Sequence, residues 1–256
     1  MVKTWSAILL GTIINVNCLA QFSPPGLGEA NTASWFAIGM KQHLNETKTV
    51  TSATHLGLGR ISNPDAYNPF EKSSIYVVNE EVTHQFRKNW KYSAALSYRW
   101  QNKYKDTPPY DLDTPNARQE LRIYSRFSYL NSLNKMDYSF SYRPELRFFY
   151  DPDFSAATKN TQFRSRFRAK AAFNLNALET HKISTTAEAM FSTTRTNSWS
   201  TFEYQEIRFC LYYSITFPKQ KLTFNLGYMN DLIGKDSITD VHYFAFDIMI
   251  NHPFSI

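Results

Sequence analysis

Long hydrophobic runs are absent from most of this sequence. Outside residues 1–20, no stretch approaches the ~18 consecutive apolar residues of a membrane-spanning helix, and the mean hydropathy is −0.44. This excludes a helical membrane protein. Cysteine is also scarce, with two residues in the chain. Because Cys18 lies in an expected signal peptide, only Cys210 remains after cleavage and no internal disulfide can form.

The first twenty residues have the pattern of a signal peptide. Lys3 supplies a positive start, residues 7–16 form a short apolar run, and Cys18 and Ala20 are small residues at positions −3 and −1 of a cleavage site. We expect cleavage near Ala20 and export of a mature chain of about 236 residues. Residues 21–34 would then be an N-terminal lead segment or a hidden first strand.

Aromatic side chains are abundant, at 16% of the chain. In the segment 90–101, apolar side chains from Trp90 to Trp100 alternate with mostly polar ones from Lys91 to Gln101. Successive side chains of a strand point to opposite faces, so one face is apolar with aromatic ends and the other is polar. The pattern recurs in nearly every segment. It predicts an all-β fold, an antiparallel up-and-down transmembrane β-barrel of the outer-membrane type.

Eleven segments carry this pattern, in one domain over residues 35–256. Bacterial barrels of this class have even strand numbers, so we expect about 12 strands, with 10 as the alternative. The twelfth, or a stretch threaded through the lumen, would lie in residues 21–34. The expected strands are 35–45, 49–60, 74–87, 90–101, 117–130, 136–150, 161–175, 182–195, 202–217, 220–230 and 240–251.

The connections between these segments alternate in length. Short ones fall at residues 45–48, 88–89, 131–135, 176–181 and 218–219, and mostly longer ones at 61–73, 102–116, 151–160, 196–201 and 232–239. Barrels of this class place short turns in the periplasm and long loops outside the cell. The final strand should therefore end in the periplasm.

Charged residues occupy alternate positions in several strands. Placing their arginines against lipid would cost ~2–4 kcal/mol each near the midplane, so we predict that they point inward and make the lumen polar and arginine-rich. The predicted lumen-facing residues are Arg118, Glu120, Arg122, Arg126, Arg143, Glu145, Arg147, Arg164, Arg166, Arg168, Lys170, Glu188, Glu206 and Arg208.

Two interpretations of this ladder remain open. The arginines and carboxylates of adjacent strands could pair and hold a narrow barrel shut, or they could form an electropositive channel or pocket for a small anionic solute. Strands 117–175 carry more inward cations than carboxylates. The missing negative charge must come from other strands, from bound anions or from lipopolysaccharide phosphates. Consecutive Glu80 and Glu81 require one carboxylate to face outward unless a bulge intervenes.

Several functional classes receive little support. The pI is 9.1, but the basic residues sit at alternate strand positions of an exported chain, which argues against nucleic acid binding. No nucleophile-elbow or zinc-binding spacing occurs. We expect no cofactor and no metal, and interpret His43, His55, His84 and His242 as girdle or lumen residues. The expectation is therefore no enzyme, with an outer-membrane lipid-modifying hydrolase or acyltransferase as the alternative.

Several segments carry a family resemblance. The opening 35–44, the hairpin 86–99, and the arginine-rich stretches 118–122, 143–147 and 163–168 resemble the uncharacterised outer-membrane barrel family known as domain of unknown function 2490, common in Bacteroidetes-type bacteria. The resemblance covers most of the mature chain and implies a barrel fold. It implies no biochemical role.

The expected function is that of an integral barrel in the outer membrane of a Gram-negative bacterium, either a narrow pore or binding barrel or a structural component of the envelope. Its expected partners are outer-membrane lipid and lipopolysaccharide, with an anionic solute or an envelope protein as further candidates. A secreted soluble ligand-binding β-barrel is the other alternative. That class predicts apolar side chains inside and charges outside.

Overall fold

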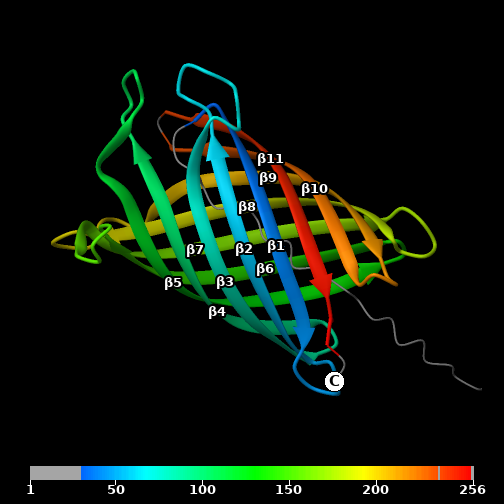
Figure 1. The fold of residues 1–256 in the computed structure, drawn as a ribbon. Coiled ribbons are helices and arrows are strands. Elements are labelled where there is room, and N and C mark those ends of the chain that lie inside the picture. The colour runs from blue at the N-terminus through cyan, green and yellow to red at the C-terminus, as the bar shows by residue number, and fades with distance from the viewer. Residues whose placement is uncertain (1–29, 236, 255–256) are drawn as a thin grey trace, which may run out of the picture.

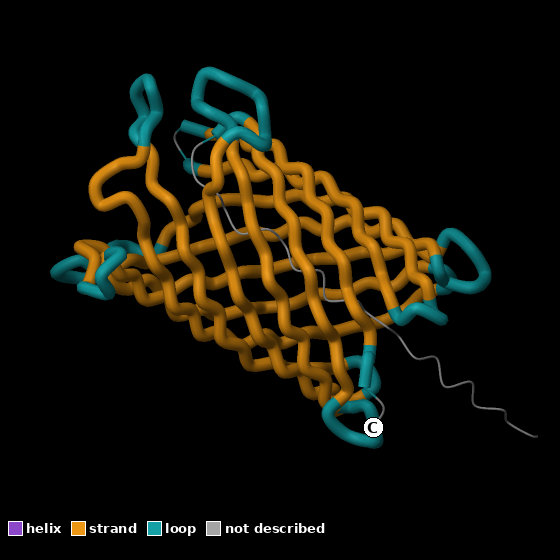
Figure 2. Tube along the Cα trace, in the orientation of Figure 1, coloured by secondary structure: helices purple, strands orange, loops and turns teal. Residues whose placement is uncertain are grey.

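The computed structural model describes residues 30–235 and 237–254. The expected signal peptide and residues 21–29 of the lead segment lie outside this range. The described residues form eleven strands closed into one barrel (Figures 1 and 2). The strands are β1 (Thr32–His43), β2 (Val50–Ile61), β3 (Lys72–Arg87), β4 (Trp90–Tyr104), β5 (Leu112–Leu133), β6 (Met136–Tyr150), β7 (Ala156–Asn174), β8 (His181–Arg195), β9 (Glu203–Phe217), β10 (Leu222–Ile233) and β11 (Thr239–Asn251).

Each predicted segment corresponds to one strand, and the all-β barrel is confirmed. The strand number of eleven differs from the twelve or ten that even-numbered barrels led us to expect. A barrel whose neighbouring strands are all antiparallel needs an even number of strands, but here β1 and β11 pair in parallel, with Trp35 opposite Ala245. The blue and red strands of Figure 1 show this pair. One parallel ladder therefore closes an otherwise up-and-down barrel.

β1 begins earlier than the sequence pattern indicated. Its first residue is Thr32, so residues 32–34 of the expected lead segment belong to the barrel wall. The loop at residues 62–71 holds this start in place. The Asn31 side chain donates to the backbone oxygens of Pro64 and Ala66, and the Ser34 hydroxyl donates to that of Pro69.

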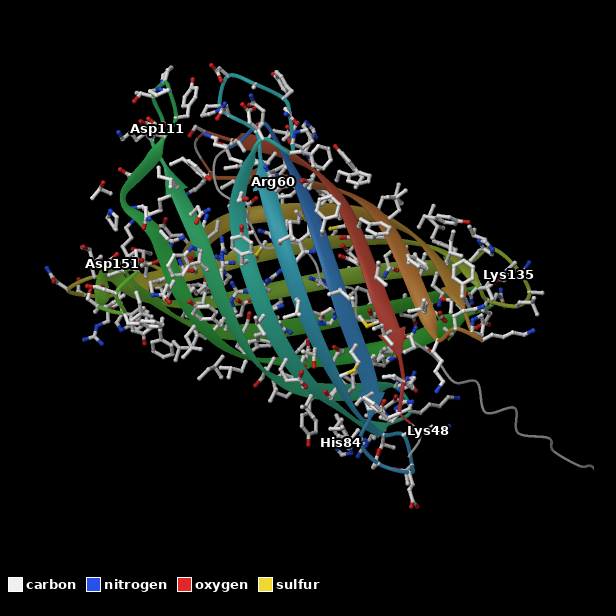
Figure 3. The ribbon with its side chains drawn as sticks, viewed as in Figure 1. Lys48, Arg60, His84, Asp111, Lys135 and Asp151 are labelled. Carbon is white, nitrogen blue, oxygen red and sulfur yellow. The ribbon has the colours of Figure 1, made fainter. Side chains whose placement is uncertain are left out.

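The two ends of the barrel differ in their connections. Lys48, His84 and Lys135 mark one end in Figure 3, whose turns span residues 44–49, 88–89, 134–135, 175–180 and 218–221. Arg60, Asp111 and Asp151 mark the other end, with connections at 62–71, 105–111, 151–155, 196–202 and 234–238. We call these the short-turn end and the long-loop end. β1 starts at the long-loop end, and β11 finishes at the short-turn end.

Alternation along the strands separates the two surfaces of the wall. Ile123 and Phe127 of β5 are each about half exposed, whereas Glu120 and Tyr124 on the same strand are buried. Directly paired residues of neighbouring strands lie on the same face of the sheet, so this division extends around the barrel. No helix of the described residues is both long and apolar enough to cross a membrane.

Candidate functional site

The predicted charge ladder lies on the inner face of β5 to β9. Register places Glu145 beside Arg164, Arg166 beside Arg143, and Glu188 between Arg168 and Arg208. Arg99 of β4 joins the ladder opposite Glu120. Side chains from six consecutive strands therefore meet in the interior, and we call them the charged wall. Its described members are Arg99, Arg118, Glu120, Arg122, Arg126, Arg143, Glu145, Arg147, Arg164, Arg166, Arg168, Lys170, Glu188, Glu206 and Arg208.

Glu120 is one centre of the charged wall. Its carboxylate accepts hydrogen bonds from Arg122 Nη2 at 2.7 Å and from Arg147 Nε and Nη2 at 2.8 and 2.7 Å. Arg99 Nη1 lies 3.7 Å from the second oxygen. These side chains are less than 10% exposed. One buried carboxylate thus joins three arginines from β4, β5 and β6.

Glu145 is the second centre. Its oxygens lie 3.0 Å from Arg143 Nε, 3.4 Å from Arg122 Nε and 3.0 Å from Arg166 Nη1. Arg122 therefore contacts Glu145 as well as the neighbouring Glu120. Both carboxylates are surrounded by guanidinium groups from neighbouring strands, an arrangement that holds these strands together.

The ion pairs continue to the strands beyond β7. Glu188 of β8 accepts from Arg166 and, at 2.6 Å, from Arg168 Nε. Arg208 of β9 lies 2.6 Å from Glu206 and 3.1 Å from Asp231 of β10. Buried charges are stable only when paired and hydrogen-bonded. The observed pairing meets this condition for most of the charged residues from β4 to β10.

Sequence reasoning missed Glu81, Asp231 and Arg99 as members of the network. Glu81 faces inward, 3.3 Å from Arg126, and accepts from the Tyr124 hydroxyl at 3.2 Å. Its neighbour Glu80 faces outward and accepts from the hydroxyls of Ser52 and Thr54. No bulge separates Glu80 from Glu81, so the two side chains point to opposite faces of β3. Counting alternate positions along β3 could therefore have predicted that Glu81 faces the lumen.

Two predicted members of the wall have no carboxylate partner among the described residues. Arg118 Nη2 donates to the side-chain oxygen of Gln101 at 3.0 Å, and its guanidinium lies 4.9 Å from the centroid of the Phe149 ring. Arg164 Nη2 donates to Gln162 at 3.4 Å. Lys170 lies on the same face, between Ser139 and Thr186 in register.

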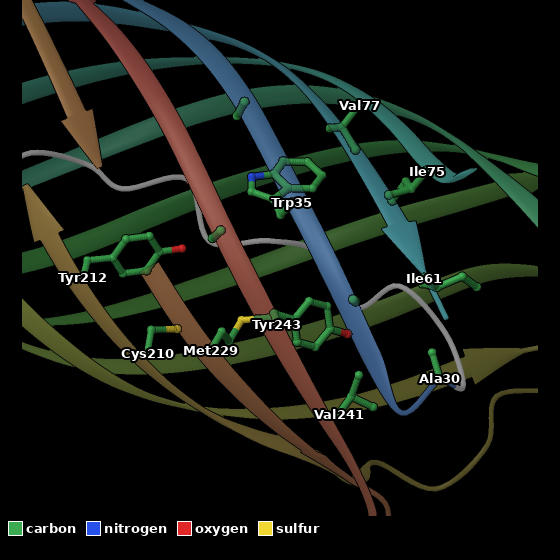
Figure 4. Close-up of a cluster of buried hydrophobic side chains, with 13 residues drawn as sticks. Ala30, Trp35, Ile61, Ile75, Val77, Cys210, Tyr212, Met229, Val241 and Tyr243 are labelled. Atoms are coloured by element: carbon green, nitrogen blue, oxygen red, sulfur yellow. The ribbon is translucent and has the colours of Figure 1, made fainter. Parts of the chain in front are cut away.

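The opposite part of the interior holds an apolar cluster, which the sequence pattern did not predict. Buried side chains of β1, β2, β3, β9, β10 and β11 form one cluster around Trp35, Tyr212 and Tyr243 (Figure 4). In β11 both faces carry apolar residues, so the sequence pattern does not distinguish its inner face from its outer face. The lumen thus contains a charged wall on one side and an apolar cluster on the other. The cluster consists of Ala30, Ala33, Trp35, Ala37, Ile61, Ile75, Val77, Cys210, Tyr212, Met229, Val241, Tyr243 and Ala245.

The candidate histidines are dispersed over the barrel. His55 is buried inside, whereas His84 lies beside the Tyr92 hydroxyl at 3.2 Å and His242 beside that of Tyr228 at 2.6 Å. Within residues 30–235 and 237–254, no group of three or more His, Cys, Asp or Glu side chains is placed to hold a metal ion.

His43 stacks on His252, which follows the last strand, with ring centroids 3.7 Å apart. Burial, the neighbouring His43 and nearby lysines lower the pKa of His252 to about 4. His252 is therefore neutral near pH 7, and its Nδ1 accepts a hydrogen bond from the His43 backbone amide at 3.1 Å.

Comparison with known proteins places this fold in a family. Neither the curated proteins nor the solved structures contain a match to the chain. One family model matches residues 32–242, from the start of β1 into β11. The match covers all six strands of the charged wall and agrees with the resemblance seen in the sequence. The chain therefore belongs to the family described as "Protein of unknown function (DUF2490)".

Proposed function

We propose that this protein is an integral outer-membrane β-barrel of a Gram-negative bacterium, with a lumen that internal ion pairs hold closed. The observation that carries the proposal is the polarity of the wall from β4 to β9, which has charges on its inner face and apolar side chains on its outer face. Exposed apolar residues occur on outward positions around the barrel, as expected for a surface in contact with lipid. They include Ile38, Leu56, Val78, Leu96, Ile123, Phe140, Phe167, Leu211, Leu226 and Phe244.

A soluble ligand-binding barrel would need the opposite arrangement. Monomeric soluble proteins rarely expose contiguous apolar patches larger than a few hundred Å², whereas exposed aliphatic and aromatic side chains here occur on neighbouring strands such as β4 and β5. Buried carboxylates such as Glu120 and Glu145 also fill positions where a lipidic ligand would need apolar contacts. The proposal therefore favours lipid outside the barrel.

The state of the lumen separates a closed barrel from a pore. Arg122, Arg147 and Arg166 face the interior but are less than 10% exposed, and each forms an ion pair with a carboxylate on a neighbouring strand. A wide aqueous channel would leave such side chains accessible to water. We therefore favour a binding or structural barrel over a general porin. In this proposal the protein is not an enzyme, because the inward Glu120 and Glu145 are both engaged by arginines.

The proposal is tested by fractionating the native envelope and recording single channels from folded, detergent-purified protein in planar bilayers. We expect recovery in the outer membrane and no steady conductance. The double variant Arg166→Gln/Arg168→Gln should lower the midpoint of thermal unfolding, because Glu188 loses both arginines. The exposed pair Arg87→Gln/Arg195→Gln removes the same charge and should leave this midpoint nearly unchanged.

Each alternative predicts a different result. Recovery in the soluble fraction would overturn the membrane assignment. Reproducible anion-selective steps that change in Arg166→Gln/Arg168→Gln would replace the closed barrel with a narrow pore. Outer-membrane recovery without conductance, together with the expected stability difference, would support the closed barrel.

A further inference from the structure

One carboxylate of the barrel points toward the outer side of the wall. Glu80 lies midway along β3 and occupies an outward position, opposite Thr54 of β2 and Leu96 of β4. Leu96 is four residues from Tyr92 and four from Trp100, two aromatic side chains near the ends of the outer face of β4. Glu80 is therefore located within the apolar band between the aromatic girdles and not at the edge of that band.

Contacts within the barrel do not neutralise this carboxylate. Its two oxygens accept hydrogen bonds from the Ser52 and Thr54 hydroxyls, but a neutral hydroxyl does not cancel a charge. Among residues 30–235 and 237–254, Glu80 forms no ion pair within 4 Å, and its side chain is only partly buried. At the outward positions of β1, β2 and β4, the one other charge in these residues is Arg60, next to the end of β2. An ionisable group in a lipid-facing surface is costly and marks a functional site.

The outer surface beside Glu80 is formed by short side chains. In the next outward row toward the short-turn end, register aligns one residue from each of β2, β3, β4 and β5, namely Ser52, Val82, Ala94 and Ser125. The rows on both sides carry larger apolar side chains on β4 and β5. Small residues allow another membrane-embedded segment to approach closely. A partner could therefore bring a polar side chain within reach of Glu80.

We propose that a different integral membrane protein packs against the outer face of β2 to β5 and that one of its lysine or arginine side chains bonds to Glu80. A cation both neutralises the carboxylate and donates to it, whereas lipid acyl chains do neither. A second copy of this chain fits less well, because the described arginines and lysines at outward positions all lie within four residues of a strand end. The inference rests on the proposed function, since only a lipid environment leaves an outward carboxylate in need of a partner.

The experiment solubilises native outer membranes in a mild uncharged detergent and separates the proteins by native electrophoresis. We expect the wild type to migrate with a second protein, as a complex larger than the purified chain, and Glu80→Gln to form about tenfold less of that complex. The control Glu203→Gln removes an exposed carboxylate at the long-loop end and should migrate as the wild type does. A co-migrating protein supports the proposal only when Glu80→Gln removes it and Glu203→Gln keeps it.

Purified variants separate a binding role of Glu80 from a role in joining β2 to β3. Glu80→Gln keeps an acceptor for the hydroxyls of β2, so its midpoint of thermal unfolding in detergent should equal that of the wild type. Ala94→Trp leaves Glu80 unchanged but covers the row of short side chains, so it should also remove the complex. Ala187→Trp makes the same change at an outward position of β8 and should leave the complex intact.

Several results would overturn the inference. They are outer-membrane recovery at the mass of the single chain, a complex that survives Glu80→Gln or Ala94→Trp, and a complex formed by two differently tagged copies of this chain. Recovery of the wild type outside the outer membrane would overturn the proposed function together with this inference. Failure of the inference alone is therefore distinguishable from failure of the proposed function.

Discussion

The guanidinium group of Arg166 joins three strands by itself. Nη1 lies 3.0 Å from Glu145 of β6, and Nη2 donates to Glu188 of β8. The side chains of Arg166, Glu145 and Glu188 are all less than 5% exposed, so both carboxylates depend on protein donors and not on bulk water. Arg164, two residues earlier on the same face, lacks such a partner among the described residues. The two arginines therefore have different energetic roles in nearly the same position.

This difference predicts opposite responses to the same substitution. Arg166→Met leaves Glu145 and Glu188 short of a buried partner and should reduce the free energy of unfolding by about 3–5 kcal/mol. Arg164→Met removes a charge that forms no ion pair within 4 Å among the described residues, so its cost should be below about 1 kcal/mol, or the change should stabilise the barrel. Urea unfolding followed by circular dichroism in one detergent measures both. Equal losses would contradict the assigned pairing.

At the scale of the elements, aromatic rings of the apolar cluster lie over glycines of neighbouring strands. The Trp35 indole of β1 lies over Gly57 of β2, where an added Cβ would come within 2.3 Å of the ring. Tyr212 of β9 covers Gly227 of β10 in the same way, at 2.2 Å. Large rings can lie along the inner wall here because the adjacent strand has no side chain.

Gly57→Ala tests this packing. The new methyl group would overlap the Trp35 ring, and forced repacking of this kind costs ~1–3 kcal/mol. In a Trp35→Leu background the same substitution should be neutral or slightly stabilising, because alanine is more favourable than glycine in an unhindered strand. A double-mutant cycle on unfolding free energies measures the coupling. Additive effects of the two substitutions would show that the ring and the glycine are not in contact.

The sequence predicts the charged half of the barrel far better than the apolar half. Between Arg143 and Arg168, charged and apolar residues alternate strictly along the strands. Because arginine in lipid is costly, only one orientation is possible, with the charged face toward the lumen. In β11, Phe244 outside and Tyr243 inside are both aromatic, so alternation carries no orientation signal. The number of eleven strands could not be predicted from the sequence either. An odd number requires the parallel pairing of β1 with β11, and that pairing depends on contacts between distant parts of the chain.

At the scale of the whole molecule, the two ends of the barrel are built differently. The long-loop end carries the β4–β5 hairpin, where Tyr104 pairs with Leu112 beyond the regular wall. Lys72 steadies this hairpin, with its Nζ 3.2 Å from the Tyr110 backbone oxygen and 4.5 Å from the centroid of the Tyr104 ring. The short-turn end has two-residue connections at 88–89 and 134–135. In the proposed outer-membrane orientation, these ends face the outside and the periplasm.

An inserted epitope tests that orientation. An epitope between Pro108 and Pro109 should bind antibody on intact cells, whereas one between Lys88 and Asn89 should require permeabilised cells. Both lie in connections between strands, so neither insertion interrupts a strand of the barrel. Matched protein levels in the outer-membrane fraction control for misfolding. The reverse pattern would invert the orientation, and antibody binding to both on intact cells would exclude it.

The parallel ladder also has a consequence for the order of folding. The ten antiparallel ladders join strands that follow one another in the chain, whereas β1 and β11 are separated by almost the whole barrel. Contacts between distant residues form slowly because their loop-closure entropy is lost before they are made. We therefore expect β1–β11 pairing to be the last step. Gln42 bonds to both backbone groups of Phe254, and His252 to the Lys41 backbone oxygen. These bonds fasten the ladder once it has closed.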